Sequence, residues 1–440
     1  MPHLEDKQSI RMKLISKNNE HASSQGISGT KIASCYERMC RRLVLKSLKK
    51  MKAGRLILFL PEGGEKEYGK GANLEPAVIR VQSNRFFSKC VLHGDIGLGE
   101  SYVDGDWETD DISAVISWFI LNLQQSPSMS GSKTRSLFMN CLGIVNRIGH
   151  RLRPNSLKTS RRNIHEHYDL GNEFYKLFLD ETMTYSCGYF GSKMRSLSEA
   201  QTAKYELLCQ KLKISEKDHV LEIGCGWGGF AEHASRKYGW RITGITISEK
   251  QLRFAEKRIA EAGLSEKVEI LFKDYRLVKG SFDKIVSIEM LEAVGDEYLE
   301  EYFGQCNRLL KQDGILGLQI ITCPDSRYDE LRTGTDWIQK HIFPGSLLLA
   351  QHRITEAMKN TGELFLHSWE EFSQSYVQTL KIWHERFNDS LEDVQKQGFG
   401  EEFIRKWNYY LCYCHAGFSM RNIGVAQAIY TRPNNLALKN

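Results

Sequence analysis

The 440-residue chain is long enough for two or three domains, and its 41% apolar and 26% charged residues are typical of a globular protein. No apolar run reaches the roughly 18 residues that a membrane-spanning helix needs, and the polar N-terminus lacks the pattern of a secretory signal. The eleven cysteines form no C-x-x-C pair and no ligand spacing, so we expect neither a disulfide framework nor a metal site. These features predict a reduced, cytoplasmic protein.

The net charge of +6 is unevenly distributed. Residues 112–165 contain no Asp or Glu but many Lys and Arg, and residues 41–51 alternate basic and apolar side chains as in a helix with one basic face. Such a surface suits an anionic partner, either a phospholipid membrane or a nucleic acid. A solvated charged face without a partner is the alternative.

The N-terminal third predicts a small α+β domain. Residues 1–32 are polar and aperiodic, which predicts a disordered tail, and the domain itself covers residues 33–125. The segments with strand character are 56–60, 77–81 and 85–91, and an apolar helix ends at Leu123. Residues 126–162 are rich in Ser, Gly and basic residues and predict a linker.

Residues 163–440 alternate between helical and strand patterns, which predicts a mostly parallel sheet covered by helices on both faces. The predicted strands are 219–223, 241–245, 268–272, 282–288, 314–322 and 425–430. The predicted helices are 198–212, 250–262, 369–388 and 401–422. Ligands of such a sheet bind at the carboxyl ends of its strands.

The central motif of the chain is V-L-E-I-G-C-G-W-G-G-F, which begins at Val220 and reads as strand, tight turn and helix start. Its glycines allow close approach of a ligand, and the helix start attracts an anionic group. The motif also satisfies the dinucleotide pattern G-x-G-x-x-G, but the second strand ends in Thr246-Ile247-Ser248 instead of an acidic residue. The acidic residue is Glu222, inside the first strand. This E-x-G-x-G-x-G order resembles motif I of class I S-adenosylmethionine-dependent methyltransferases.

Polar residues follow the next strands as well. Thr246 and Gln251 could contact a cofactor ribose, although Ser248 and Gln251 also form a helix-capping pattern. Asp274 and Tyr275 could hydrogen-bond to and stack on an adenine, whereas Asp274 could equally be a turn residue.

Two carboxylates, Glu289 and Glu292, follow the fourth strand at a spacing that puts them on one side of a helical turn. A carboxylate there could bind a cation or hold a base. Helix starts favour Glu for electrostatic reasons alone, which is the alternative.

Several motifs in one order make the chain similar to the cyclopropane-fatty-acyl-phospholipid synthase family, from about Cys40 onward. They are N-I-x-x-H-Y-D-L-G-N from Asn163, Y-S-C from Tyr185, E-x-G-C-G-W-G-G from Glu222, T-I-S-x-x-Q from Thr246 and Y-Y-L to A-G-F from Tyr409. G-L-G-E-S-Y-V-D-G-D-W from Gly97 resembles that family's N-terminal lipid-engaging domain. The sequence Glu-Ala-Val-Gly from Glu292, where the family usually has E-H-V-G, resembles the plant-type branch.

The resemblance implies a class I methyltransferase fold, Rossmann-like with a mostly parallel seven-stranded sheet, preceded by a small α+β lipid-engaging domain. It implies S-adenosylmethionine as cofactor and a cis double bond of a phospholipid acyl chain as the methyl acceptor. The resulting carbocation loses a proton to a bound bicarbonate, and a cyclopropane ring closes. The implied partner is a phospholipid membrane, contacted peripherally by a homodimer, and not a nucleic acid.

The resemblance also implies site residues. Cys187, Glu292 and Tyr376 match positions that hold bicarbonate, and Gln319 stands where the family has His, so hydrogen bonding is kept but the imidazole is lost. Cys414 matches a cysteine once proposed as a nucleophile, although cysteine is often buried for packing alone. The implied cofactor-binding residues are Tyr185, Ser186, Glu222, Gly224, Cys225, Gly226, Gly228, Thr246, Gln251, Asp274 and Tyr275.

Other functions remain open at this stage. A related enzyme could leave a methyl or methylene branch, and small-molecule N-methyltransferases have related catalytic domains. A nonenzymatic lipid- or nucleic-acid-binding protein is a third alternative. The sequence fixes neither acyl-chain length, double-bond position nor head group.

Overall fold

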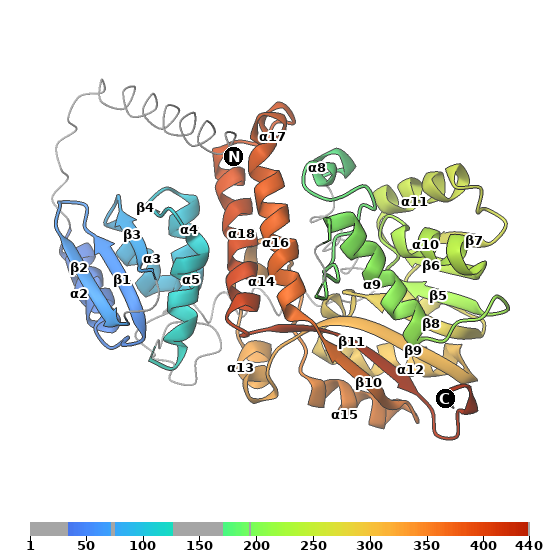
Figure 1. Ribbon diagram of the computed structural model, residues 1–440. Coiled ribbons are helices and arrows are strands. Elements are labelled where there is room, and N and C mark those ends of the chain that lie inside the picture. The colour runs from blue at the N-terminus through green and yellow to red at the C-terminus, as the bar shows by residue number, and fades with distance from the viewer. Residues whose placement is uncertain (1–33, 72–74, 126–169, 193–194, 439–440) are drawn as a thin grey trace.

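The computed structural model describes residues 34–71, 75–125, 170–192 and 195–438. The predicted tail and the predicted basic linker lie outside these residues. An N-terminal unit with a four-stranded sheet lies on one side and a seven-stranded sheet on the other (Figure 1). Two long helices, α16 (Ser373–Asp389) and α18 (Glu401–Ser419), pack against each other between them (Figure 1).

The N-terminal sheet has the strand order β2-β1-β3-β4. Its strands are β1 (Gly54–Phe59), β2 (Glu65–Lys70), β3 (Ala77–Val81) and β4 (Trp107–Glu108). Its helices are α2 (Cys35–Leu48), α3 (Arg85–His93), α4 (Asp95–Val103) and α5 (Ile112–Leu121).

The prediction of a strand at residues 85–91 was wrong, because this segment belongs to α3. Phe87 and Val91 lie four residues apart and are both buried, so one helical face meets the core, whereas a strand would need alternation. The sequence pattern also missed β2, in which Tyr68 is the one buried side chain. Such a charged edge strand carries little periodic signal.

The large sheet has the order β10-β11-β9-β8-β5-β6-β7. Strands β5 (His219–Ile223), β6 (Arg241–Thr246), β7 (Val268–Phe272), β8 (Phe282–Ile288) and β9 (Leu310–Thr322) are parallel. Strands β10 (Phe365–Glu371) and β11 (Gly424–Thr431) add an antiparallel edge. The helices of this unit are α8 (Asn172–Lys176), α9 (Leu197–Lys211), α10 (Gly229–Tyr238), α11 (Glu249–Glu261), α12 (Leu299–Leu309), α13 (Tyr328–Thr333), α14 (Trp337–His341), α15 (Gln351–Thr361) and α17 (Leu391–Lys396).

This architecture confirms the predicted α/β fold with a mostly parallel seven-stranded sheet. Residues 220–223 of β5 are all buried, as expected of a parallel strand covered on both faces. The prediction of one helix over 369–388 was wrong at its start, because Trp369 to Glu371 pair with β11 as the end of β10. In β5 to β9 the carboxyl ends meet at one edge, which is where ligands of such sheets bind.

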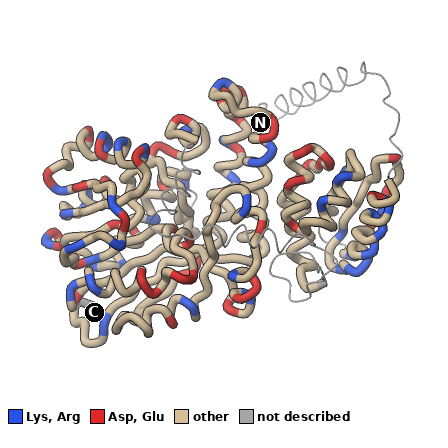
Figure 2. The backbone as a smooth tube through the Cα atoms, turned by 180° about the vertical axis from the view of Figure 1, so that it is seen from behind, with Lys and Arg blue, Asp and Glu red and all other residues tan. Residues whose placement is uncertain are grey.

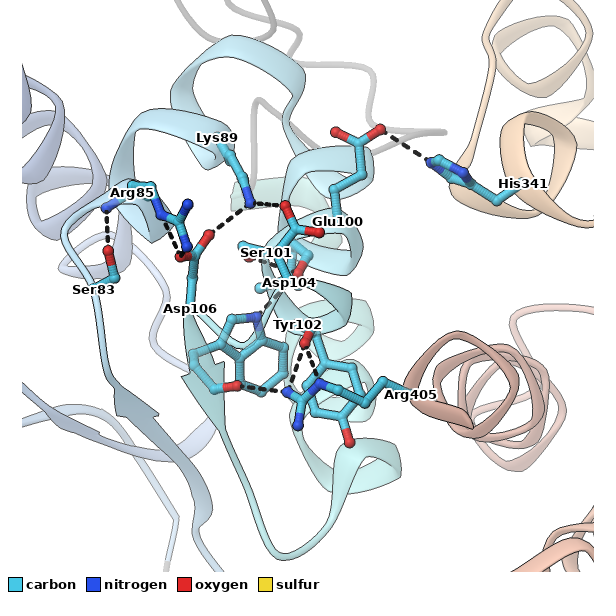
Figure 3. A network of polar contacts seen from close by, with 12 residues as sticks. Ser83, Arg85, Lys89, Glu100, Ser101, Tyr102, Asp104, Asp106, His341 and Arg405 are labelled. Carbon is cyan, nitrogen blue, oxygen red and sulfur yellow. Dashed lines mark hydrogen bonds and ion pairs between the residues drawn. The ribbon is translucent and has the colours of Figure 1, made fainter. Parts of the chain in front are cut away.

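The G-L-G-E-S-Y-V-D-G-D-W motif joins the N-terminal unit to the unit that contains the seven-stranded sheet (Figure 3). Arg405 of α18 donates from Nε to the carbonyl of Tyr102 over 2.8 Å, and its guanidinium lies 4.2 Å from the centre of the Tyr102 ring. Glu100 accepts hydrogen bonds from Lys340 at 2.6 Å and His341 at 3.0 Å. The contacts therefore give this motif a structural role between the units, and its engagement of lipid stays a prediction.

Gly99 shows how close this packing is. A Cβ at Gly99 would lie 2.4 Å from the Trp337 ring, so no larger side chain fits without movement. Within the described ranges, no helix is both long and apolar enough to cross a bilayer.

Candidate active site

A cavity of about 160 Å³ lies at the carboxyl ends of β5, β6 and β8, and we call it the cofactor cavity. Ten of the eleven residues that the sequence assigned to cofactor binding line it. They are Tyr185, Ser186, Glu222, Gly224, Cys225, Gly226, Thr246, Gln251, Asp274 and Tyr275. Residues as distant in the chain as Tyr185 and Tyr275 thus meet at one edge of the sheet, as the strand topology requires.

The glycine turn forms one wall of the cofactor cavity. Gly224 and Gly226 have φ angles of +82° and +53°, which other residues rarely adopt. A Cβ at Gly224 would lie 2.8 Å from Met290, whereas one at Gly226 would meet no heavy atom within 4 Å. Gly228 does not line the cavity, because it caps the start of α10 and a Cβ there would lie 3.1 Å from Ala255. This glycine serves helix packing in the structure.

Glu222 presents a buried carboxyl group to the cofactor cavity. Its Oε2 atom has no hydrogen-bond partner among the described residues. Burial raises the pKa of Glu222 to about 8, against the opposing charge of Lys204. A buried polar atom without a partner costs free energy, so this oxygen is suited to a donor or cation supplied by a ligand.

The other predicted cofactor contacts are held by their neighbours. The Thr246 hydroxyl donates to Gln251 Oε1 over 2.9 Å, and Ser248 caps α11 by accepting from the backbone N–H of Gln251. Asp274 accepts from the Arg276 side chain through both carboxylate oxygens, each at 2.8 Å. These residues therefore cap or close turns and also line the cavity, and their contact with a cofactor stays a prediction.

A second cavity of about 290 Å³, which we call the apolar cavity, lies next to the first. This cavity extends from the unit with the seven-stranded sheet to the N-terminal unit, whose helix α5 contributes Ile116 and Ile120. Its other lining residues include Ile338, Phe343, Leu347, Leu380, Tyr410 and Cys414. Tyr185, Glu289, Met290 and Ala293 line both cavities and form their shared wall.

Glu289 is the centre of a hydrogen-bond cluster at this shared wall. Its Oε1 accepts from the backbone N–H of Cys187 at 2.9 Å and from Gln319 Nε2 at 2.8 Å. Its Oε2 accepts from the Tyr376 hydroxyl at 2.7 Å. Three residues that the resemblance assigned to the anion site thus contact one side chain of the protein itself.

Two further buried residues orient this cluster. Gln427 lies opposite Gln319 in the pairing of β11 with β9 and donates to Gln319 Oε1 over 3.2 Å, which directs the Gln319 NH₂ group toward Glu289. Lys204 is fully buried and donates to Ser186 Oγ and Gln201 Oε1, each at 2.7 Å. Burial lowers the pKa of Lys204 to about 8, and the Glu289 charge opposes this shift.

The side chains of Glu292 and Cys414 and the thiol of Cys187, which were also predicted to be catalytic, are not bonded to Glu289. Glu292 lines the apolar cavity, where its Oε1 accepts from the Ile321 N–H and its Oε2 has no partner among the described residues. Cys414 lines the same cavity, and burial raises the pKa of its thiol. The Cys187 thiol donates to the Gly188 carbonyl, and its pKa is also raised by burial. Both thiols therefore stay protonated, which disfavours a nucleophilic role.

The sequence analysis paired Glu289 with Glu292 as carboxylates that could bind a cation or hold a base, and it missed Lys204 and Gln427. A signal was available, because Gln427 stands between Ala426 and Ala428 in a strand where both neighbours are fully buried. A polar side chain inside such a strand needs a partner.

With this geometry established, comparisons with known proteins identify the family. The family model described as mycolic acid cyclopropane synthetase matches residues 155–428. Tuberculostearic acid methyltransferase UfaA1 of Mycobacterium tuberculosis is 36% identical over 76% of this chain and 78% of its own length. Cyclopropane-fatty-acyl-phospholipid synthase of Escherichia coli K12 is 33% identical over 81% of this chain and 88% of its own.

Among solved structures, mycolic acid cyclopropane synthase CmaA1 complexed with SAH and CTAB is 28% identical, with a TM-score of 0.57. The match covers 62% of this chain and 98% of that one. These findings confirm the resemblance seen in the motifs. The chain belongs to the mycolic acid cyclopropane synthetase family and is an S-adenosylmethionine-dependent methyltransferase.

Proposed function

We propose that this enzyme transfers the methyl group of S-adenosylmethionine to a cis double bond in a phospholipid acyl chain and forms a cyclopropane. The observation that carries the proposal is the shared wall between a polar cavity with a glycine turn and a larger apolar cavity. An acyl chain in the apolar cavity would present its double bond to that wall, opposite the cofactor.

The cofactor cavity fits S-adenosylmethionine. The unpartnered Glu222 Oε2 can accept a hydrogen bond from a cationic ligand, and the open space over Gly226 admits close approach to the backbone. Thr246 and Gln251 would face the ribose, and Asp274 and Tyr275 the adenine. When bound, S-adenosylmethionine supplies an electrophilic methyl group on a sulfonium.

The apolar cavity suits a reaction that generates a carbocation in the acyl chain. Water would quench such a cation, and aliphatic side chains from both units, such as Ile116, Ile338 and Leu380, form part of the wall against which an acyl chain would pack. Tyr185, Phe343 and Tyr410 add aromatic faces, which attract cations.

The bicarbonate base that the resemblance implies does not fit these residues as they are arranged. The Cys187 N–H, the Gln319 amide and the Tyr376 hydroxyl already donate to the Glu289 carboxylate. An added anion would have to displace that carboxylate or lie beside it, and two like charges in a buried site repel. No step is therefore assigned to bicarbonate.

Peripheral binding to an anionic membrane is part of the proposal. Figure 2 shows Lys and Arg on the N-terminal unit at the end away from the large sheet. Helix α2 and the turn after it expose Arg42, Lys46, Lys49 and Lys50, together with Met39 at 52% exposure. We expect cosedimentation with anionic vesicles that weakens with salt and weakens further in a K46E/K49E/K50E variant. Salt-insensitive binding would contradict this part of the proposal.

A methyl-branched product is the second candidate, because one relative that is 36% identical is named a tuberculostearic acid methyltransferase. The two products require the same methyl transfer and differ in which carbon loses a proton: loss from the new methyl closes the ring, whereas loss from a chain carbon leaves a methyl branch next to a double bond. Both lie within lipid methylation and share the proposed substrate.

Expression in a bacterial host that lacks its own enzyme tests the function. We expect acyl chains heavier by one methylene, with the double bond lost in mass spectrometry and a cyclopropane signal in nuclear magnetic resonance. A methyl-branched chain would select the second candidate. Unchanged lipids, from folded protein that binds S-adenosylmethionine, would refute a lipid acceptor.

A further inference from the structure

The backbone of Glu289 adopts an unusual conformation. Its φ angle is +49°, in the left-handed region that residues with a side chain rarely enter. The residue directly follows β8, and its N–H donates to the carbonyl of Gln319 over 2.7 Å. Strain of this kind persists where the surrounding structure enforces it, often at functional sites. Here it accompanies a side chain with three hydrogen-bond donors around it.

These donors come from three separate parts of the fold. Cys187 lies in the loop before α9, Gln319 in β9 and Tyr376 in α16. Hydrogen bonds to a carboxylate favour its ionised form, whereas burial favours the protonated form. Burial raises the pKa of Glu289, and its donors and Lys204 limit the rise. A carboxylate with a raised pKa is a stronger base than one in water.

The position of Glu289 is equally specific. Of the described residues, it is the one acidic side chain that lines both the cofactor cavity and the apolar cavity. Glu222 and Asp274 line the first cavity alone, and Glu292 lines the second alone. A base that removes a proton from a newly attached methyl group must lie where the two cavities meet.

We propose that Glu289 is the catalytic base of this enzyme and occupies the place of the external anion that the family resemblance implies. This inference rests on the proposed function. The π electrons of the double bond form a bond to the methyl carbon, and the electrons of the broken C–S bond remain on sulfur. The Glu289 carboxylate then takes a proton from that methyl carbon, and the C–H electrons close the ring. The proton later leaves Glu289 for solvent.

Glu292 is the competing carboxyl group, and its surroundings argue against it. Burial and the neighbouring Glu289 charge raise the pKa of Glu292 to about 8, so it holds a proton at neutral pH. It accepts from the Ile321 N–H through one oxygen, and it lies off the shared wall. Hydrogen bonds to the ionised form stabilise a carboxylate, and Glu289 accepts three of them, whereas one oxygen of Glu292 has no partner among the described residues.

Turnover of unsaturated phospholipid vesicles by Glu289→Gln is the first test. We expect product formation to fall by about 100-fold or more, the scale of general-base loss, while the Kd for S-adenosylmethionine stays within about twofold. Glu256→Gln, at an exposed position on α11, is the matched control and should match the wild type. The wild-type rate should be equal in carbonate-free buffer and in added bicarbonate. A wild type that needs bicarbonate, or an active Glu289→Gln, would overturn the inference.

Anion binding provides a second test that does not depend on turnover. Glu289→Gly suits the positive φ angle and leaves the three donors without their acceptor. We expect carbon-13-labelled formate and bicarbonate to bind this variant and not the wild type, and formate to restore part of its rate. Tight bicarbonate binding by the wild type would refute the inference. A wild type that binds S-adenosylmethionine but converts no lipid would refute the proposed function instead, and the binding test would still show whether Glu289 fills the anion position.

Discussion

Glu222 and Glu292, which each line one of the two cavities, differ from Glu289 on the shared wall in how their carboxyl groups are hydrogen-bonded. Glu222 in the cofactor cavity and Glu292 in the apolar cavity each keep one oxygen without a partner among the described residues. Glu289, on the wall between them, accepts three hydrogen bonds. A carboxyl group with an open oxygen is arranged to receive a ligand, whereas a fully bonded carboxylate is already fixed in place for chemistry.

The difference also concerns charge. Burial raises the pKa of both Glu222 and Glu292 to about 8, so both are mostly protonated at pH 7. Lys204 is fully buried, and the Glu289 charge is the largest of the charges that raise the pKa of Lys204. The charge of Lys204 in turn lowers the pKa of Glu289 and so favours the ionised form of that carboxyl group.

Replacing Glu222 tests the carboxyl group that is open to a ligand, and of the variants considered it should have the largest effect on cofactor binding. In Glu222→Gln the side chain keeps its shape but cannot ionise beside a cationic ligand. Loss of one charge-assisted hydrogen bond costs about 2 kcal/mol, or roughly 30-fold in Kd. Calorimetric titration with S-adenosylmethionine should show this weakening, with Glu256→Gln as control. A Kd within twofold of the wild type would remove the distinction between Glu222 and Glu289.

Tyr376→Phe tests the fully hydrogen-bonded carboxylate, because it removes one of the three donors to Glu289. The ring stacks on Phe418 with centres 4.3 Å apart, and phenylalanine preserves that contact. We expect kcat to fall about tenfold, with little change in the Kd for S-adenosylmethionine. The lost donor should raise the pKa of Glu289, so the rising limb of the pH–rate profile should move to higher pH.

Tyr409→Phe is the matched control for that variant. The Tyr409 hydroxyl is buried without a hydrogen-bond partner among the described residues, and Tyr409 lines neither cavity. Its removal should leave both kcat and the pH–rate profile unchanged. Equal effects of the two substitutions would mean that Tyr376 acts through packing and not through Glu289.

The large sheet was predictable from sequence because its strands are short apolar runs between helical patterns. Four of its predicted strands begin at the residues where β5, β6, β7 and β8 begin. The N-terminal sheet was less predictable, since β2 is a charged edge and α3 has too few turns to show a period. Local patterns fail where an element is short or where one side chain alone meets the core.

The cofactor cavity was predictable for a related reason. Its residues follow strand ends, and parallel topology brings strand ends together. The family resemblance grouped Cys187, Gln319 and Tyr376, but residue spacing did not predict that they meet around Glu289, because Cys187 contributes its backbone N–H and Tyr376 comes from a helix 87 residues away from Glu289. No spacing rule connects a loop, a strand and a helix that meet through one strained residue. The motif from Gly97 likewise gave no sign that it would pack on Arg405.

Glu292→Gln should have the smallest effect of these substitutions, and we expect it in protein stability. The pH dependence of that stability change tests whether the Glu292 carboxyl group is protonated at neutral pH. The folded-state pKa of Glu292 is about 8 and its ordinary value is 4.5, so the folded protein binds more protons than the unfolded chain between these values. The free energy of unfolding therefore falls as pH rises from about 5 to 8. Glutamine cannot ionise and removes this loss, so the variant's Tm should exceed that of the wild type by a few degrees at pH 8. The difference should shrink toward zero at pH 5 in scanning calorimetry. A difference that is constant with pH would mean that Glu292 is already ionised in the folded protein, and the contrast with Glu289 would then be lost.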